Sequence, residues 1–283
     1  MRDPVLVTGA AGFLGRRLVA ALAADRVEVH AITRSVADVP GASVVRRVRS
    51  YAETPAVRGA VLIHLAGERS LAVAEANGAA GVVEASEVAA ALAGKPYRGL
   101  ILASSAVVYG DQSAEPHRPD EVVPPPRGRY AEAKLACEAP FVREGGLVLR
   151  LGNVYGPGMA RDSVVAEIAA QIPGSGPVVV RNAGPVRDFV WIDDVIGAFV
   201  TAVRQLTAGI LNIGSGRGTS IAALAATALK VARQESRPVQ ALQTSERPSV
   251  CVLDVSATRS ALRWTAETSL ESGLASLLAG ARV

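Results

Sequence analysis

The first half of the chain alternates between short runs of apolar residues and longer stretches with apolar residues at helical spacing. The apolar runs predict strands at 4–8, 27–32, 44–48, 60–65, 99–104 and 147–151. The stretches between them predict helices at 12–24, 73–92 and 129–144. Continuous apolar strands joined by helices are typical of a parallel sheet that is covered on both faces. The expected fold class is therefore α/β, with a doubly wound parallel sheet.

The second half is less regular, and glycine and proline interrupt it at 156–158 and 173–177. Its pattern predicts helices at 193–205 and 219–233, strands at 209–213 and 250–253, and two terminal helices. We expect a first domain over residues 1–153 and a smaller lobe formed mainly by 154–283. The segment 186–213, with strands near Phe189 and Leu211, is expected to return to the first domain.

Composition narrows the classes of protein that this chain can be. Hydrophobic residues make up 49% and charged residues 20% of its 283 residues, which excludes a disordered or fibrous chain. Cys137 and Cys251 are its two cysteines, so a disulfide framework and a cysteine-rich metal site are excluded. The three histidines are scattered along the chain. We therefore expect no metal.

The net charge of +4, from 30 basic and 26 acidic residues, suits an anionic small molecule better than a nucleic acid. Aromatic residues are only 4% of the chain, which leaves few platforms for stacking bases. No apolar segment is long enough to cross a membrane or to serve as a secretory signal. We expect a cytoplasmic protein that binds neither nucleic acid nor membranes.

A glycine-rich turn lies between the first strand and the first helix. Gly9 permits a tight turn, Gly12 lets a phosphate approach backbone N–H groups, and Gly15 lets the helix pack closely on the sheet. The spacing is G-x-x-G-x-x-G, and a plain tight turn is the alternative interpretation. Its position predicts a Rossmann-type domain that binds a dinucleotide.

The second strand ends in Thr33 and Arg34, where NAD-binding sheets usually carry an acidic residue for the adenosine ribose. A carboxylate there would repel a 2′-phosphate, whereas an arginine attracts one. We therefore expect NADP as the cofactor, with NAD as the alternative. A solvated loop position is the other interpretation of Arg34.

Tyr130 and Lys134 are four residues apart on a predicted helix and so project from the same face. A free tyrosine has a pKa of about 10, and a neighbouring ammonium favours its phenolate. Ser105 follows the strand at 99–104, at the sheet edge where ligands bind in open α/β folds. The pattern predicts a Ser–Tyr–Lys catalytic triad, against the alternative of an exposed helical pair.

With these motifs in order, the chain resembles the extended short-chain dehydrogenases/reductases, in the group of nucleotide-sugar epimerases, dehydratases and ketoreductases. The resemblance runs through nearly the whole chain. It rests on the glycine turn, the triad and the segments 64–67, 150–157, 187–195, 212–216, 262–264 and 269–274.

The resemblance implies roles for individual residues. Tyr130 would act as general acid or base, Ser105 would bind the reacting oxygen, and Lys134 would hold the nicotinamide ribose. Asn153, Arg187 and Arg247 would join Ser105 in binding the substrate, and for each arginine a structural role is the alternative. The expected cofactor-binding residues are Gly9, Gly12, Phe13, Leu14, Gly15, Thr33, Arg34, Leu65, Ala66, Tyr130 and Lys134. The resemblance also implies a homodimer built on the two long helices of the sheet.

Departures from the family pattern reduce the number of reactions that this chain is expected to catalyse. Sugar 4,6-dehydratases of this family carry an Asp-Glu pair where this chain has Ala106 and Val107, so dehydration is excluded. We expect a reductase of a nucleotide-linked 4-keto-deoxysugar. The alternatives are a 4-epimerase with tightly bound NAD and a non-catalytic NADP sensor.

Overall fold

A seven-stranded parallel sheet forms the centre of the protein. The computed structural model describes residues 3–68, 70–113, 115–244 and 247–280. The strands run in the order β3-β2-β1-β4-β5-β6-β10. Their bounds are β1 Val5–Thr8, β2 Val29–Thr33, β3 Val44–Arg47, β4 Val61–His64, β5 Gly99–Ser105, β6 Leu147–Leu151 and β10 Gly209–Ile213. This is the doubly wound α/β sheet that the apolar runs predicted.

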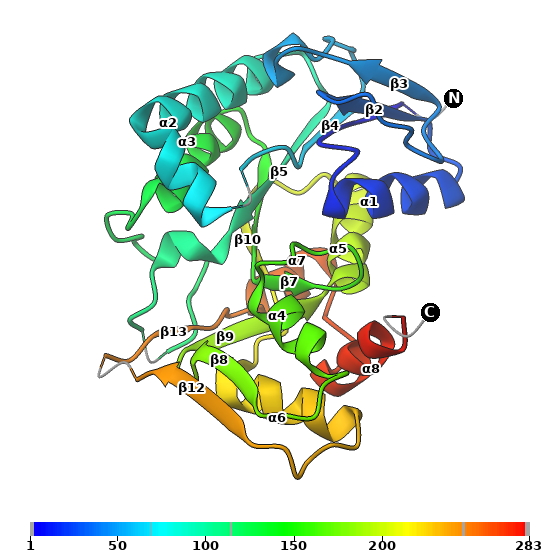
Figure 1. Ribbon diagram of the computed structural model, residues 1–283. Coiled ribbons are helices and arrows are strands. Elements are labelled where there is room, and N and C mark those ends of the chain that lie inside the picture. The colour runs from blue at the N-terminus through cyan, green and yellow to red at the C-terminus, as the bar shows by residue number, and fades with distance from the viewer. Residues whose placement is uncertain (1–2, 69, 114, 245–246, 281–283) are drawn as a thin grey trace.

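Two pairs of helices cover the two faces of this sheet (Figure 1). The helices α1 (Phe13–Ala24) and α5 (Ile192–Gln205) pack together on one face. The helices α2 (Leu71–Ala93) and α3 (Arg129–Arg143) pack together on the other. In β1, alternate residues enter different cores: Leu6 lies in the core beneath α2 and α3, while its neighbours Val5 and Val7 face the other core.

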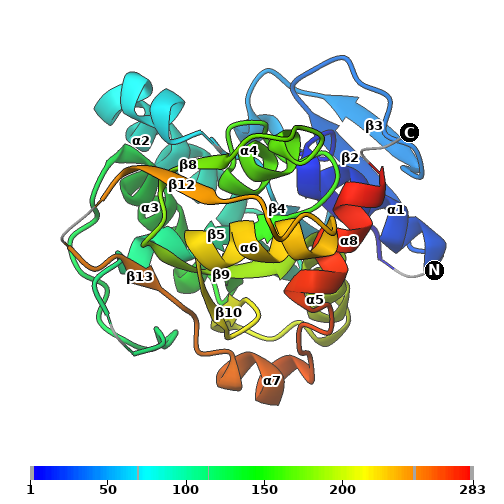
Figure 2. The same cartoon turned by 60° about the horizontal axis from the view of Figure 1, so that its bottom comes forward.

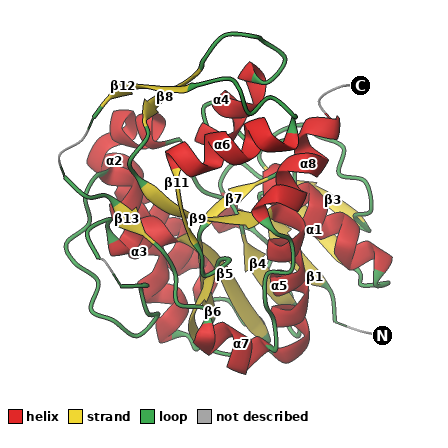
Figure 3. Ribbon diagram, turned by 90° about the horizontal axis from the view of Figure 1, so that it is seen from below, coloured by secondary structure: helices red, strands yellow, loops and turns green. Residues whose placement is uncertain are grey.

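A smaller lobe lies beyond the carboxyl ends of the strands, at the bottom of Figure 1. One sheet of the lobe contains β7 (Asn153–Tyr155), β9 (Val186–Trp191), β11 (Gly218–Ser220) and β13 (Val250–Cys251). A parallel pair of strands lies beside it, β8 (Val178–Asn182) and β12 (Val239–Gln243), as Figure 2 shows. Helices α4 (Val164–Gln171), α6 (Ile221–Val231) and α8 (Leu270–Gly280) surround these strands (Figure 3). The remaining helix, α7 (Ser256–Leu262), packs against β10 and α5.

The segment 186–213 divides between the two parts of the protein, which differs from the sequence prediction. Strand β10 joins the main sheet beside β6, and α5 packs on it, as expected. Strand β9 instead pairs with β7, β11 and β13. The buried carboxylate of Asp188 accepts backbone N–H bonds from Ser215, Gly216 and Leu253, which fixes β9 to the lobe.

Element boundaries shift where backbone hydrogen bonds continue past the apolar pattern. Strand β2 begins at Val29 and not at Val27, because the N–H of Val27 still bonds Leu22 O at the end of α1. Helix α2 bends at Gly78, whose φ of 59° is not helical.

Within the described residues, no helix is long and apolar enough to span a bilayer.

Candidate functional site

The glycine turn between β1 and α1 is shaped by contacts that exclude side chains. Gly9 has a φ of +69°, and a Cβ there would lie 2.9 Å from the backbone nitrogen of Ala66. A Cβ on Gly15 would overlap the carbonyl oxygen of Gly9 and the backbone of Ala10. Gly12 is the N-cap of α1, and no side chain caps the helix there. The first turn of α1 can therefore offer its N–H groups to an anion.

A cleft of about 670 Å³ opens over this turn. It is lined by all the residues that the sequence analysis assigned to the cofactor: Gly9, Gly12, Phe13, Leu14, Gly15, Thr33, Arg34, Leu65, Ala66, Tyr130 and Lys134. We call it the cofactor cleft. The helix N-terminus suits a pyrophosphate, and the cleft also reaches Arg34 after β2 and Lys134 on α3. The residues present therefore fit NAD or NADP.

Arg34 and Tyr51 form the end of the cofactor cleft beside β2. The guanidinium of Arg34 lies 5.3 Å from the centre of the Tyr51 ring. Tyr51 belongs to a short 3₁₀ helix, η1 (Tyr51–Glu53), which Ser50 caps through its side chain. The strand itself ends in Thr33, whose hydroxyl bonds Ser35, so β2 ends without a carboxylate. Thr33 thus stands where an acidic residue would select NAD, and the positively charged Arg34 follows it.

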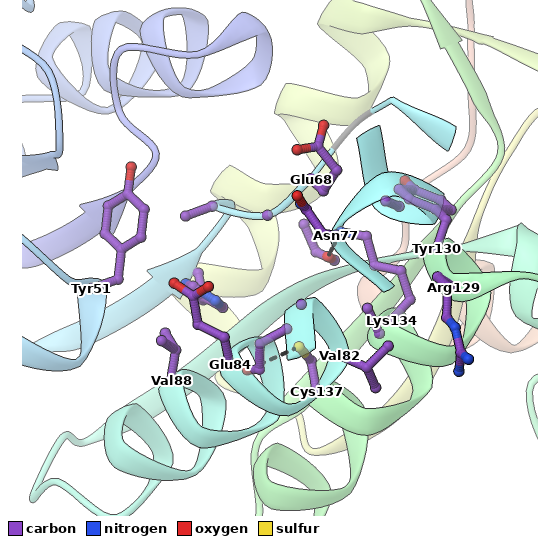
Figure 4. A pocket seen from close by; sticks show the side chains of 18 of the residues that line it. Tyr51, Glu68, Asn77, Val82, Glu84, Val88, Arg129, Tyr130, Lys134 and Cys137 are labelled. Carbon is purple, nitrogen blue, oxygen red and sulfur yellow. Dashed lines mark hydrogen bonds between the residues drawn. The ribbon is translucent and has the colours of Figure 1, made fainter. Parts of the chain in front are cut away.

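The Ser–Tyr–Lys residues come together at the other end of the cofactor cleft. Ser105 ends β5, and its hydroxyl accepts the N–H of Val107 at 3.3 Å. Tyr130 and Lys134 lie in the first two turns of α3, with Lys134 Nζ 5.7 Å from the centre of the Tyr130 ring (Figure 4). Lys134 Nζ also donates to the carbonyl oxygen of Ala103 at 3.2 Å, which ties α3 to β5.

A smaller pocket of about 160 Å³ extends from this cleft between α2 and α3 (Figure 4). His64 lines it but is buried, and its Nδ1 lies 2.6 Å from the hydroxyl of Thr8. Burial, and then the charge of Lys134, lower the pKa of His64 to about 3. Cys137 bonds Ala85 O through its thiol, and burial raises its pKa. His64 is therefore a neutral packed residue, and Cys137 is a protonated thiol.

A second cleft of about 630 Å³ adjoins the cofactor cleft, and Ser105 and Tyr130 line both. We call it the substrate cleft. It collects every residue that the sequence analysis assigned to the substrate: Ser105, Asn153, Arg187 and Arg247. Ala106 and Val107, from the 3₁₀ helix η2 (Ala106–Tyr109), also line it. Side chains that cannot transfer protons thus occupy the wall beside the triad.

An ordered polar network holds the two arginines of the substrate cleft. Arg187 Nη2 donates to Ser249 Oγ at 2.8 Å, and Ser249 Oγ donates to Asp111 at 2.6 Å. Arg247 Nη2 donates to the second oxygen of Asp111 at 2.8 Å. Burial alone would raise the pKa of Asp111, but these hydrogen bonds and charges lower it below its usual value. Arg187 is therefore linked to Asp111 through Ser249, and these contacts are also those expected of the structural alternative.

Asp111 and Arg127 line this cleft and were not found from the sequence, and neither was Ser249, which bonds Arg187 and Asp111. With the Gln112 amide turned so that its oxygen faces the guanidinium groups, that oxygen accepts from Arg127 Nη1 at 2.8 Å. These residues come from the loop after η2 and from the segment before β13. An isolated bridge between Gln112 and Val250 joins the two segments. No periodic pattern marks such positions, because long-range pairing of two loops leaves no local signal.

Comparison with known proteins agrees with this geometry. The family model described as "NAD dependent epimerase/dehydratase family" matches residues 5–214. The GDP-6-deoxy-D-mannose reductase of Pseudomonas aeruginosa is 31% identical over 85% of this chain and 84% of its own. The dTDP-L-rhamnose 4-epimerase of Burkholderia thailandensis is 29% identical over 96% of this chain and 93% of its own.

Among solved structures, UDP-glucose 4-epimerase of Thermotoga maritima, crystallised with UDP-glucose, superimposes with a TM-score of 0.85 at 24% identity. The match covers 99% of this chain and 98% of that structure. It shows that the whole architecture, including the small lobe, is shared. The prediction of an NAD(P)-dependent enzyme is confirmed by these relatives. The chain belongs to the NAD-dependent epimerase/dehydratase family.

Proposed function

We propose that the protein is an NADP(H)-preferring reductase of a nucleotide-linked 4-keto-deoxysugar. The observation that carries this proposal is the junction of the two clefts at Ser105 and Tyr130. A substrate in one cleft and a nicotinamide in the other would meet at these two hydroxyl groups. Arg187 and Arg247 lie in the same substrate cleft as Ser105 and Tyr130, and guanidinium groups suit the phosphates of a sugar nucleotide.

The residues of the cofactor cleft would hold NADPH, which would supply the hydride for the keto carbon and leave as NADP⁺. Tyr130 gives its proton to the carbonyl oxygen, which becomes a hydroxyl. Ser105 binds that oxygen and polarises the carbonyl. Lys134 orients Tyr130 and places a positive charge beside the phenolate that remains, until solvent returns the proton.

One feature of the site supports reduction over dehydration, and another supports NADP over NAD. The wall beside the triad carries Ala106 and Val107, which cannot remove or donate the protons that elimination of water requires. The end of β2 carries Thr33 and Arg34, and Arg34 can pair with a 2′-phosphate. Measured Kd values test the cofactor preference directly. We expect tighter binding of NADPH than of NADH, and tenfold tighter binding of NADH would contradict the proposal.

A 4-epimerase is the second candidate, because a relative that matches 96% of the chain carries that name. An epimerase oxidises and re-reduces the same carbon and therefore keeps its NAD bound. The two candidates are separated by incubating the purified protein with a TDP-linked 4-keto-6-deoxyhexose and NADPH. A reductase consumes NADPH in proportion to substrate. An epimerase is instead purified with stoichiometric NAD⁺ and leaves external NADPH unchanged.

We propose further, from family resemblance, that the protein acts in the cytoplasm as a homodimer that pairs through α2 and α3. Light scattering during size-exclusion chromatography tests the dimer. A mass of two chains is expected, and a single-chain mass would contradict this part of the proposal.

A further inference from the structure

A buried carboxylate lies one helical turn beyond Lys134. Glu138 follows Lys134 by four residues on α3, so Tyr130, Lys134 and Glu138 fall along one face of the helix. The side chain of Glu138 is only 5% exposed. Burial of a carboxylate is costly unless it is paired and hydrogen-bonded. The proposed proton transfer does not use Glu138, so its position requires a separate explanation.

The contacts of Glu138 reach the two strands that end at the triad. Ser104, the residue directly before Ser105 in β5, donates its hydroxyl to Glu138 Oε1 at 2.5 Å. Arg150 of β6 donates from Nε to the same oxygen at 3.0 Å and from Nη2 to Oε2 at 2.7 Å. Leu151 and Gly152, which follow Arg150, line both clefts. The carboxylate of Glu138 thus joins α3, which carries Tyr130, to β5, which ends at Ser105, and to β6.

Arg150 extends these contacts to the segment after Ser105. Its guanidinium carbon lies 4.7 Å from the centre of the Tyr109 ring, and Tyr109 ends η2. The Tyr109 hydroxyl donates to Asn212 of β10 at 2.7 Å. Burial alone would lower the pKa of Arg150, but the hydrogen bonds and charge of Glu138 raise it above its usual value. Arg150 is therefore a permanent cation held between a carboxylate and an aromatic ring.

We infer that Glu138 is a positioning residue that fixes Tyr130 on α3 relative to Ser105 at the end of β5. The kinetic part of this inference rests on the proposed function. The ammonium of Lys134 bonds β5 only through one backbone oxygen, at Ala103. Glu138 adds two attachments one turn away: a hydrogen bond from Ser104 of β5 and a bidentate pairing with Arg150 of β6. The position of Tyr130 relative to Ser105 should affect the reaction rate strongly, because displacement of a reacting group by about 1 Å can lower the rate about 100-fold.

Removing both charges separates positioning from simple stabilisation. Glu138→Gln alone leaves Arg150 buried and unpaired, and so destabilises the protein. The double variant Glu138→Met/Arg150→Met removes the whole ion pair and keeps the volume filled, which is often neutral for stability. We expect this double variant to recover the wild-type Tm and yet to retain a kcat about 10- to 100-fold below wild type. KM and the Kd of NADPH should change little.

Glu144→Gln is the matched control, because Glu144 caps the end of α3 at an exposed position. It loses the same charge and should keep the wild-type kcat. A double variant with wild-type Tm and wild-type kcat would overturn the inference. If the double variant does not fold, Glu138→Asp decides, because it keeps the charge and shortens the side chain by one methylene. It should lower kcat, and unchanged kcat would overturn the inference.

A spectroscopic readout decides the inference without any substrate. The chain has five tyrosines, so ¹⁹F NMR of protein labelled with 3-fluorotyrosine gives few signals, and Tyr130→Phe assigns the one from Tyr130. In the double variant the Tyr130 signal should shift or broaden, while that of Tyr97 stays in place. An unmoved Tyr130 signal would overturn the inference. If wild type reduces no keto sugar, the proposed function fails while this measurement still tests Glu138.

Discussion

The cofactor cleft and the substrate cleft share a wall but are built in different ways. The cofactor cleft is formed mainly by the carboxyl ends of β1, β2, β4 and β5, where glycines and small residues let a ligand approach the backbone. The substrate cleft is formed by side chains from η2, β7, α4, β9 and the segment before β13, which are far apart in the sequence. Under the proposed function, the main sheet and α3 would position the reacting groups, whereas η2 and elements of the lobe would select the substrate.

The largest expected effect follows from Tyr130→Phe, because Tyr130 lines both clefts. Removing its hydroxyl removes the proton donor, so we expect kcat to fall by about 10²- to 10⁴-fold while the Kd of NADPH changes little. Steady-state kinetics and fluorescence titration measure the two quantities. Tyr97→Phe is the control, since that hydroxyl bonds Pro55 O away from both clefts. Retained activity in Tyr130→Phe would exclude it as the acid.

Gly9→Ala should affect the cofactor cleft alone. Its φ of +69° strains any side chain, and the added Cβ would press on the backbone of Ala66 at 2.9 Å. We expect the Kd of NADPH to rise about 10- to 100-fold, as displaced N–H groups lose charge-assisted hydrogen bonds to the pyrophosphate.

Gly145→Ala is a matched control for this change, because Gly145 has a φ of +72° and open space around its Cβ position. Both variants should lose about 1–2 kcal/mol of stability from the strained backbone. Equal NADPH affinity in the two variants would show that the glycine turn does not bind the cofactor.

Arg187→Met should affect the substrate cleft alone. Loss of a charged hydrogen bond to a phosphate costs about 2 kcal/mol, so KM for the nucleotide sugar should rise about 30-fold. The Kd of NADPH should stay at its wild-type value. Arg181→Met, at an exposed position of β8, provides the control. If KM were unchanged and NADPH binding weakened, the assignment of the two clefts would be reversed.

The smallest expected effect concerns stability beneath the cofactor cleft. The pKa of His64 is lowered to about 3 in the folded protein, so between pH 6.5 and 3 only the unfolded chain binds a proton there. His64 should therefore contribute full stability above pH 6.5, and about 2 kcal/mol should be lost between pH 6.5 and pH 5. Urea unfolding of wild type and His64→Asn at pH 7 and pH 5 measures this loss.

Asparagine keeps a partner for the Thr8 hydroxyl but does not titrate in this range. The His64→Asn variant should therefore lose less stability than wild type over the same pH interval, and His30→Asn should lose as much as wild type. Parallel losses in all three proteins would mean that His64 is not held neutral by the fold.

The sequence predicted best what is determined by local pattern. The strands at 147–151 and 209–213 were located to the residue, because each is a short apolar run between clear turn signals. The placement of Tyr130 and Lys134 was also predicted from local pattern, because residues four positions apart on a helix project from the same face. The residues assigned to each cleft line that cleft, and their individual roles remain predictions.

The sequence could not predict pairings that depend on the partner. Strand β9 was expected in the main sheet, but apolarity alone does not select which sheet a strand joins, and its buried Asp188 bonds the lobe. Asp111 and Ser249 meet only because two loops pair across 138 residues. Glu138 did carry a signal, since it extends the Tyr130–Lys134 spacing by one more turn, but a carboxylate on a helix is ordinarily solvated.

One isotope measurement tests the central claim most directly, namely that hydride passes to a keto sugar where the two clefts meet. NADPH deuterated at C4 of the nicotinamide, on both faces, is incubated with the protein and a TDP-linked 4-keto-6-deoxyhexose, and the product is analysed by mass spectrometry and NMR. The expected result is one deuterium at C4 of the sugar for each NADPH oxidised, with incorporation about 10²- to 10⁴-fold slower in Tyr130→Phe. Conversion of sugar nucleotides without uptake of deuterium, or no conversion at all, would contradict the account.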